Sequence, residues 1–136
     1  MNDYTNILRQ HNLKATPQRL AIMDIIEYNG HINIDNLYEE VKKKFSSISL
    51  ATIYKNINSM VENFLLIEVK LPSRKPVYEI IKKEHSHLLC KDCGEVIDVE
   101  VDTSKILNDI SSKYNFDIDG TDVILSGTCP TCKDKN

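Results

Sequence analysis

The seventeen residues from Glu84 to Glu100, EHSHLLCKDCGEVIDVE, hold two of the four histidines, two of the four cysteines and five of the acidic residues in a chain of 136. Imidazole, thiolate and carboxylate groups are the usual protein ligands of transition metals. Such a concentration of them predicts metal binding, and their spacing divides them into two sites.

The four cysteines form two C-x-x-C pairs, Cys90 with Cys93 and Cys129 with Cys132. Each pair brackets a turn that can point two thiolates at one ion, and two pairs complete the four-sulfur tetrahedron of a closed zinc site. The 35 residues between the pairs exceed the usual ribbon spacing, but they can hold a helix and a strand that return the second pair to the first. We therefore predict a structural zinc ion. The alternative is a redox dithiol switch, which needs only one such pair.

The histidines belong to a second site. His85 and His87 are two residues apart on a predicted strand, so both imidazoles project from one face, whereas Cys90 has the opposite parity. A hairpin folded at the first C-x-x-C turn sets His87 opposite Asp98. We expect two further ligands, Glu79 on the preceding strand and His31 between the second and third helices. Any one of them alone could be an ordinary polar residue, but together they predict a site for Fe(II), Mn(II), Co(II) or Zn(II).

The elements that position these residues begin with four predicted helices, over about residues 4–11, 17–28 and 34–45 and from Leu50 to about Val61. Thr16, Asn33 and Ser49 are the expected N-caps. Strand-like runs over 65–71 and 76–81 follow, joined by the basic turn PSRK. Helices followed by a hairpin of this kind indicate a winged helix.

The second half is predicted to form strands over 85–90 and 95–100, a helix over 103–114 and a strand over 116–127, which is followed by CPTC. The predicted fold class is α+β. It comprises an amino-terminal winged-helix DNA-binding domain over residues 1–82 and a small carboxy-terminal α+β domain over residues 83–136.

A nucleic-acid partner is indicated by local surfaces, because the net charge of −3 gives no global basic field. One face of the fourth helix carries Thr52, Tyr54 and Lys55 and no carboxylate before Glu62, which suits phosphates and base edges. Lys14 and Arg19 lie in another segment without acidic residues.

Other classes fit less well. The longest apolar run is four residues, which excludes a membrane span, and we expect a cytoplasmic protein. A metal-dependent hydrolase is the enzyme alternative, but the sequence has no H-E-x-x-H and no deaminase pattern, so we predict that the chain is not an enzyme. A DNA-binding module whose metals are all structural is the other alternative, and His31 distinguishes it from a regulated one.

Five segments together resemble the Fur family of metal-dependent bacterial repressors over nearly the whole chain. They are LKATPQR from Leu13, GHINIDNLYEEV from Gly30, SLATIYKNINSM from Ser49, HSHLLCKDCG from His85 and the final CPTC. The resemblance implies a homodimer with an amino-terminal DNA-binding domain, a carboxy-terminal dimerisation domain and a four-cysteine structural zinc. It also implies a regulatory metal site spanning the two domains, with the ligands His31, Glu79, His85, His87 and Asp98.

By the same resemblance, Tyr54 and Lys55 face the major groove, Lys14 lies near the minor groove and Arg19 contacts phosphate. The regulatory metal is expected to fix the angle between domains, so that the two halves of the dimer match successive major grooves of a palindromic operator.

The resemblance also bears on what is sensed. Asp98 is similar to the peroxide-sensing branch of the family, PerR, whereas Glu79 is closer to the iron-sensing pattern. In a peroxide sensor, bound Fe(II) leads to oxidation of His31 or His85 and release of the promoter, while Mn(II) gives an insensitive repressor. We favour the peroxide sensor. Iron-sensing and zinc-sensing repressors are the alternatives.

Overall fold

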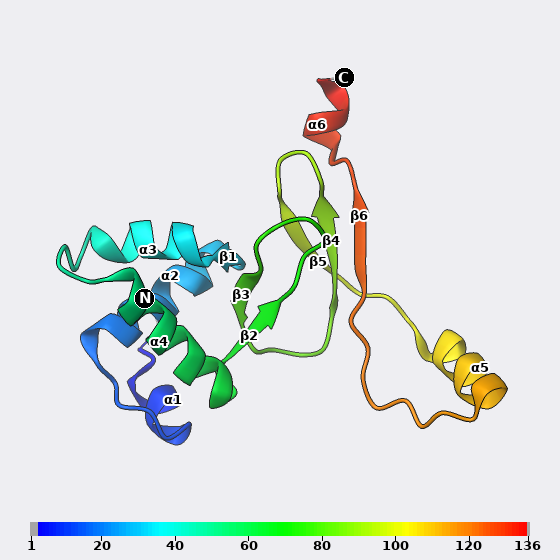
Figure 1. Ribbon diagram of the computed structural model, residues 1–136, viewed down its shortest axis with the longest axis horizontal. Helices are drawn as coiled ribbons and strands as arrows, with labels where there is room; N and C mark the ends of the chain where they lie inside the picture. The colour runs from blue at the N-terminus through cyan, green and yellow to red at the C-terminus, as the bar shows by residue number, and fades with distance from the viewer. Residues whose placement is uncertain (1–2, 136) are drawn as a thin grey trace. The chain divides into compact units, whose positions relative to one another are not determined.

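The computed structural model describes residues 3–135, and the chain divides into two compact units that meet in sequence between Lys82 and Lys83 (Figure 1). The first unit holds α1 (Thr5–Gln10), α2 (Pro17–Asn29), β1 (Ile32–Asn33), α3 (Ile34–Lys42), α4 (Leu50–Glu62), β2 (Leu66–Val69) and β3 (Val77–Ile80). The second holds β4 (Ser86–Cys90), β5 (Val96–Val99), α5 (Ser104–Tyr114), β6 (Ile124–Gly127) and α6 (Pro130–Asp134). The predicted α+β class is confirmed.

The helices of the first unit begin where the sequence predicts. Thr16 Oγ1 accepts a hydrogen bond from the Arg19 amide at 3.3 Å, and the Asn33 and Ser49 side chains cap α3 and α4 in the same way. Each cap satisfies an amide that the first turn leaves without a helical partner. Gly30, with a φ of 75°, ends α2.

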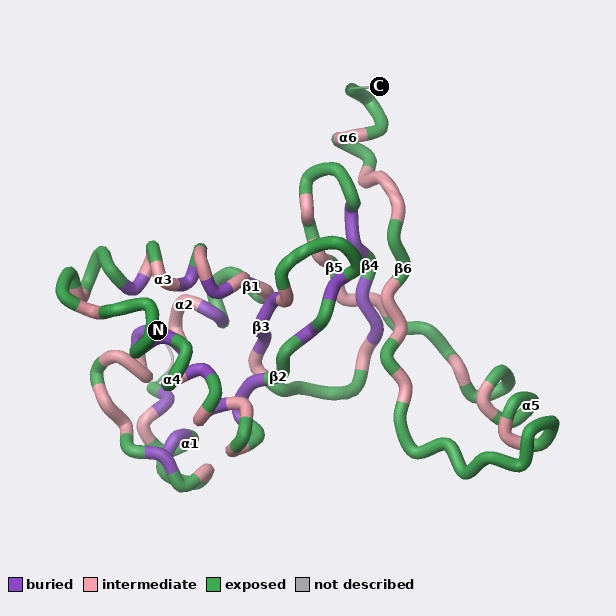
Figure 2. Tube along the Cα trace, in the orientation of Figure 1, coloured by how far each residue is buried: buried purple, intermediate pink, exposed green. Residues whose placement is uncertain are grey.

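The core of the first unit lies among these helices, and its buried segments are coloured purple in Figure 2. Ile22, Ile26, Leu37, Ile53 and Ile57 are fully buried. One detail of the prediction is wrong, because α3 ends at Lys42 instead of continuing to residue 45.

The sheet of the first unit has the strand order β1-β3-β2, with both pairings antiparallel. The hairpin of β2 and β3 was predicted, but β1 was not. Burial and a 3.0 Å hydrogen bond from the Tyr78 hydroxyl to Glu68 Oε2 raise the pKa of Tyr78 to about 12. Helices followed by this small sheet form the expected winged helix.

The second unit is built on a sheet of order β5-β4-β6. β4 pairs antiparallel with β5 as predicted, while β6 pairs parallel with β4. The predicted last strand was too long, since only Ile124–Gly127 is extended, and the short helix α6 after it was not predicted. Helix α5 stands apart from this sheet (Figure 1). Among the described residues, no helix has the length and apolar character needed to cross a membrane.

Candidate functional site

The four cysteines come together in the second unit. Their sulfur atoms all lie within 4.8 Å of one another, and none of the four forms a disulfide. The parallel register pairs Cys90 with Gly127, which brings the turn after β4 and the start of α6 to the same end of two neighbouring strands. The Cys129 amide donates to Cys90 Sγ at 3.3 Å, and Cys129 Sγ caps α6 by accepting from the Cys132 amide.

This cluster fits the zinc ion that its composition predicts. Zinc–sulfur bonds of about 2.3 Å in a tetrahedron separate the sulfurs by about 3.8 Å, and Cys93 Sγ lies 3.8 Å from Cys129 Sγ. Amide hydrogen bonds from Cys93 and Cys129 lower the pKa of Cys90 to about 6, whereas the hydrogen bond with the Cys129 thiol raises the pKa of Cys132 to about 12. A divalent cation favours the thiolate form of all four, because metal binding displaces their protons.

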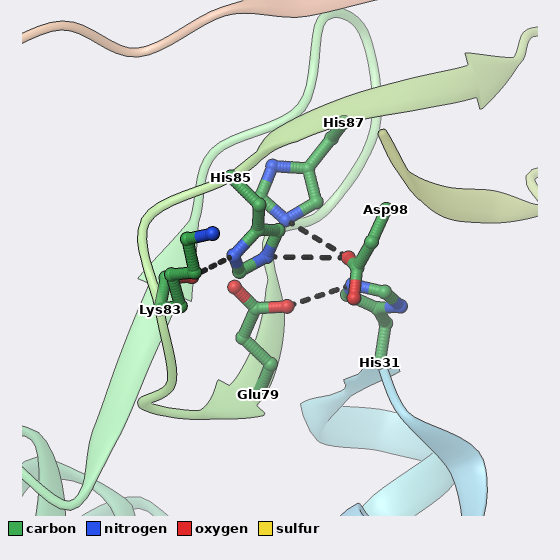
Figure 3. Close-up of polar contacts among 6 residues, drawn as sticks. All are labelled: His31, Glu79, Lys83, His85, His87 and Asp98. Atoms are coloured by element: carbon green, nitrogen blue, oxygen red, sulfur yellow. Dashed lines mark hydrogen bonds and ion pairs between the residues drawn. The ribbon is translucent and has the colours of Figure 1, made fainter. Parts of the chain in front are cut away.

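A second group of ligands lies on one face of the β4–β5 pair (Figure 3). His87 is directly opposite Asp98 in the register, as the sequence predicted. His85 Nε2 lies 3.2 Å and His87 Nε2 lies 3.6 Å from the same oxygen, Asp98 Oδ1. The two imidazole rings are 4.6 Å apart between centroids and meet edge to face. Two ring nitrogens and a carboxylate oxygen thus point toward one position.

The backbone fixes the orientation of the first of these rings. His85 Nδ1 lies 2.8 Å from the Lys83 carbonyl oxygen, which can only accept, so Nδ1 carries the proton (Figure 3). The neutral ring then has the lone pair of Nε2 available for a metal, as in histidines that ligate zinc. No signal in the sequence pointed to the role of the Lys83 carbonyl.

The remaining predicted ligands pair with each other in the first unit. β1 and β3 align Ile32 with Tyr78, so the next position of that register sets His31 beside Glu79. His31 Nε2 lies 2.7 Å from Glu79 Oε2. Glu79 is only 2% exposed, and a buried carboxylate is stable only with a hydrogen-bonded or charged partner. His31 supplies it here, and a cation could replace it.

The exposed face of α4 carries the residues predicted to bind DNA. Thr52, Tyr54 and Lys55 are exposed there, with Tyr54 42% exposed. Lys14 is exposed on the segment between α1 and α2. The Arg19 guanidinium donates to Asn56 Oδ1 and to the Lys14 carbonyl, two contacts that the sequence did not predict.

Three comparisons place this geometry beside known proteins. The model of the ferric uptake regulator family matches residues 10–126. The ferric uptake regulation protein of Vibrio cholerae is 30% identical over 141 residues, covering 98% of this chain and 94% of that protein. Its crystal structure, titled as revealing a rearrangement of the DNA-binding domains, has a TM-score of 0.79 over 93% of this chain and 100% of that one, again with 30% identity.

A second crystal structure with similar coverage is that of the Campylobacter jejuni peroxide stress regulator. It has a TM-score of 0.70 and 36% identity, and it covers 96% of this chain and 100% of that one. The similarity to all of these proteins extends over both units.

Proposed function

Since this chain belongs to the ferric uptake regulator family, whose model matches residues 10–126, we propose that it is a metal-dependent transcriptional repressor that binds a palindromic DNA operator as a homodimer. The family consists of metal-responsive transcription regulators, which are not enzymes.

The regulatory ion is bound by His31, Glu79, His85, His87 and Asp98 in this proposal. The observation that carries it is the convergence of His85 and His87 Nε2 on one oxygen of Asp98. Two imidazoles with one carboxylate are the donor set of many non-haem Fe(II) sites, and they also suit Mn(II). The His31–Glu79 pair offers one more imidazole and one more carboxylate.

Such an ion gives the protein its switch. His31 and Glu79 belong to the unit that ends at Lys82, and the other three ligands to the unit that begins at Lys83. An ion held by all five restricts the angle between the units, and it favours the arrangement in which both halves of a dimer reach DNA. Loss of one ligand lowers the affinity for the ion and with it the affinity for DNA.

The DNA-binding surface is assigned to the first unit. Tyr54 and Lys55 on α4 face the major groove together with Thr52, while Lys14 lies between α1 and α2 and Arg19 lies in the first turn of α2. The support is the exposure of the α4 face and its lack of carboxylates before Glu62. Hydroxyl, aromatic and ammonium groups are those that contact phosphates and base edges.

The signal we favour is hydrogen peroxide. Fe(II) held by the five residues of the proposed metal site would supply the electrons for reduction of peroxide beside the imidazoles of its own ligands. His31 and His85 are the expected targets. An imidazole that gains an oxygen atom in this way would be a poorer ligand, which would lower the affinity for the ion and with it the affinity for the operator. The 36% identity to a peroxide stress regulator supports this choice.

The second candidate signal is iron itself, supported by the 30% identity to a ferric uptake regulation protein, and zinc is a third. Peroxide treatment of the zinc-loaded protein with either Fe(II) or Mn(II) distinguishes a peroxide sensor from these. We expect mass spectrometry of tryptic peptides to find one added oxygen on His31 or His85 in the iron form alone. His11 serves as the matched internal control. If both histidines stay unmodified while the iron form binds DNA, the chain is an iron or zinc sensor.

Homodimerisation is assigned to the second unit, because helix α5 of that unit presents apolar side chains to solvent. Ile106, Ile110 and Tyr114, four residues apart along α5, are 59%, 43% and 61% exposed, and no residue of this helix is buried. Figure 2 shows the helix and the chain after it as mainly exposed. Apolar residues at this spacing form one stripe, which a second copy of the chain could cover.

Charge on that stripe should therefore separate the protomers. We expect Ile106→Lys combined with Ile110→Lys to yield monomers in analytical ultracentrifugation at concentrations where the unmodified protein is dimeric. Asn108→Lys is the matched control, since Asn108 is exposed on the opposite side of the same helix. A double variant that remains as dimeric as the control would remove α5 from the interface.

A further inference from the structure

Arg19 connects two parts of the first unit that are proposed to touch DNA. It lies in the first turn of α2, and its Nε donates to Asn56 Oδ1 on α4 at 3.1 Å. Its Nη1 donates to the Lys14 carbonyl at 3.1 Å. The guanidinium thus bridges the segment that carries Lys14 and the helix that carries Tyr54 and Lys55.

Both ends of the Asn56 side chain are engaged within the protein. Its Oδ1 accepts from Arg19, and its Nδ2 donates to the Thr52 carbonyl one turn earlier at 3.1 Å. An asparagine that reads adenine presents its amide nitrogen and oxygen together to the base edge. Asn56 instead presents this pair of groups to Arg19 and to the helix backbone.

The Lys14 segment is anchored next to Lys14 itself, because Leu13 is buried in the core and its amide donates to the Leu8 carbonyl at 2.9 Å. Residues 13–16 form neither helix nor strand, and the Lys14 carbonyl accepts from the Thr16 amide at 3.0 Å and from Arg19. The first of these bonds is local and fixes only the turn. The bond from Arg19 relates the Lys14 carbonyl to α4, because the same guanidinium also binds Asn56 on that helix.

From these contacts we propose that Arg19 is a positioning residue, which holds Lys14 at a set distance from the DNA-binding face of α4. In this proposal Asn56 is the hydrogen-bond acceptor for Arg19 and does not contact a base. The inference rests on the proposed DNA-binding function and deepens it. Lys14 and the α4 residues are expected in different grooves, so both can bind only if their separation matches the duplex. The planar guanidinium group of arginine has N–H donors in fixed directions, which suits this role. A lysine side chain cannot reproduce that geometry.

The test uses the full-length protein loaded with zinc and Mn(II), and a duplex selected by that protein from a random-sequence library. Affinity is measured by fluorescence anisotropy for the unmodified protein and for Arg19→Gln, Arg19→Lys, Asn56→Ala and the Arg19→Gln/Asn56→Ala pair. We expect Arg19→Gln to weaken binding about tenfold, as for the loss of a charged hydrogen bond. Arg19→Lys should be about as weak, although it keeps the charge.

Asn56→Ala should weaken binding equally on duplexes that differ at single base pairs. Combining it with Arg19→Gln should cost less than the product of the two separate losses, because both remove the same bridge. Circular dichroism melting of each variant verifies that the fold is kept.

Two results would overturn this inference alone. The first is recovery of full affinity in Arg19→Lys, with a salt slope about one unit shallower in Arg19→Gln, which identifies a phosphate contact. The second is relaxed preference at one base pair in Asn56→Ala, which identifies base readout. If the unmodified protein selects no duplex, the proposed function itself fails, and the role of Arg19 fails with it.

Discussion

In a His31→Ala variant, we expect added Mn(II) to give no gain in DNA affinity. In the proposed site this imidazole is the one histidine ligand from the first unit, so its loss leaves the ion held mainly by the second unit. Couplings between an effector and a second ligand are typically about 5- to 150-fold. If Mn(II) raises the DNA affinity of the unmodified protein by a factor of that size, the same factor in the variant should be about one, which is no gain. Glu79 would then also be a buried carboxylate without its 2.7 Å partner.

The measurement is a fluorescence anisotropy titration of a selected duplex at several Mn(II) concentrations, with zinc content and thermal melting determined in parallel. His11→Ala is the matched control. His11 Nδ1 binds the Asn63 carbonyl at 2.8 Å and belongs to no ligand group, so its loss should affect stability slightly and leave the metal response intact. A His31→Ala protein that responds to Mn(II) as the control does would mean that the regulatory ion is bound without His31.

The second large effect is expected at the cysteine cluster. A Cys129→Ser variant should lose its zinc, and residues 83–136 should then exchange their amide hydrogens rapidly while residues 1–82 remain protected. The reason is the small core of the second unit, where the buried positions among the described residues are Ser86, His87, Leu89 and Cys90. So little buried apolar surface does not stabilise a unit of this size, and a metal ion held by the four cysteines would supply the missing stability.

Hydrogen exchange read by mass spectrometry tests this, with zinc content measured in the same samples. Thr131→Ala is the matched control, because Thr131 is exposed within the same C-P-T-C turn and carries no ligand. If residues 83–136 stay protected in zinc-free Cys129→Ser protein, the cysteine cluster is dispensable for folding. That result would favour the alternative that the cysteines form a redox dithiol switch.

The sequence was most informative where local geometry decides the structure. Parity along a strand and the position of one turn were enough to set His87 opposite Asp98, and the register confirms it. The caps at Thr16, Asn33 and Ser49 were predicted because short polar side chains satisfy helix amides wherever a helix begins. These features depend on neighbours within a few residues or on a single hairpin.

The prediction was weaker where distant segments meet. The two-residue strand β1 is too short to show a period, yet its pairing with β3 is what sets His31 beside Glu79. The parallel pairing of β6 with β4 joins residues more than 30 positions apart, which no local pattern reveals. The helix α6 did have a signal, since Pro130 follows a residue able to cap, but the turn was read only as a metal-binding loop.

Arg19 is an intermediate case. Its charge and its segment without acidic residues indicated a phosphate contact, but composition alone cannot tell a side chain that reaches outward from one that bridges two elements. The hydrogen bonds to Asn56 and to the Lys14 carbonyl supply that distinction.

Strand β4 contains both His87 and Cys90, so one five-residue segment contributes to two different clusters of ligands. A newly made polypeptide without zinc at its cysteines would lack an ordered β4, which is the strand that positions the histidines. If both clusters bind metal as proposed, the four sulfur ligands would have to be filled before the histidine site can form. Zinc starvation would accordingly prevent the protein from responding to its regulatory metal, although that metal is a different ion.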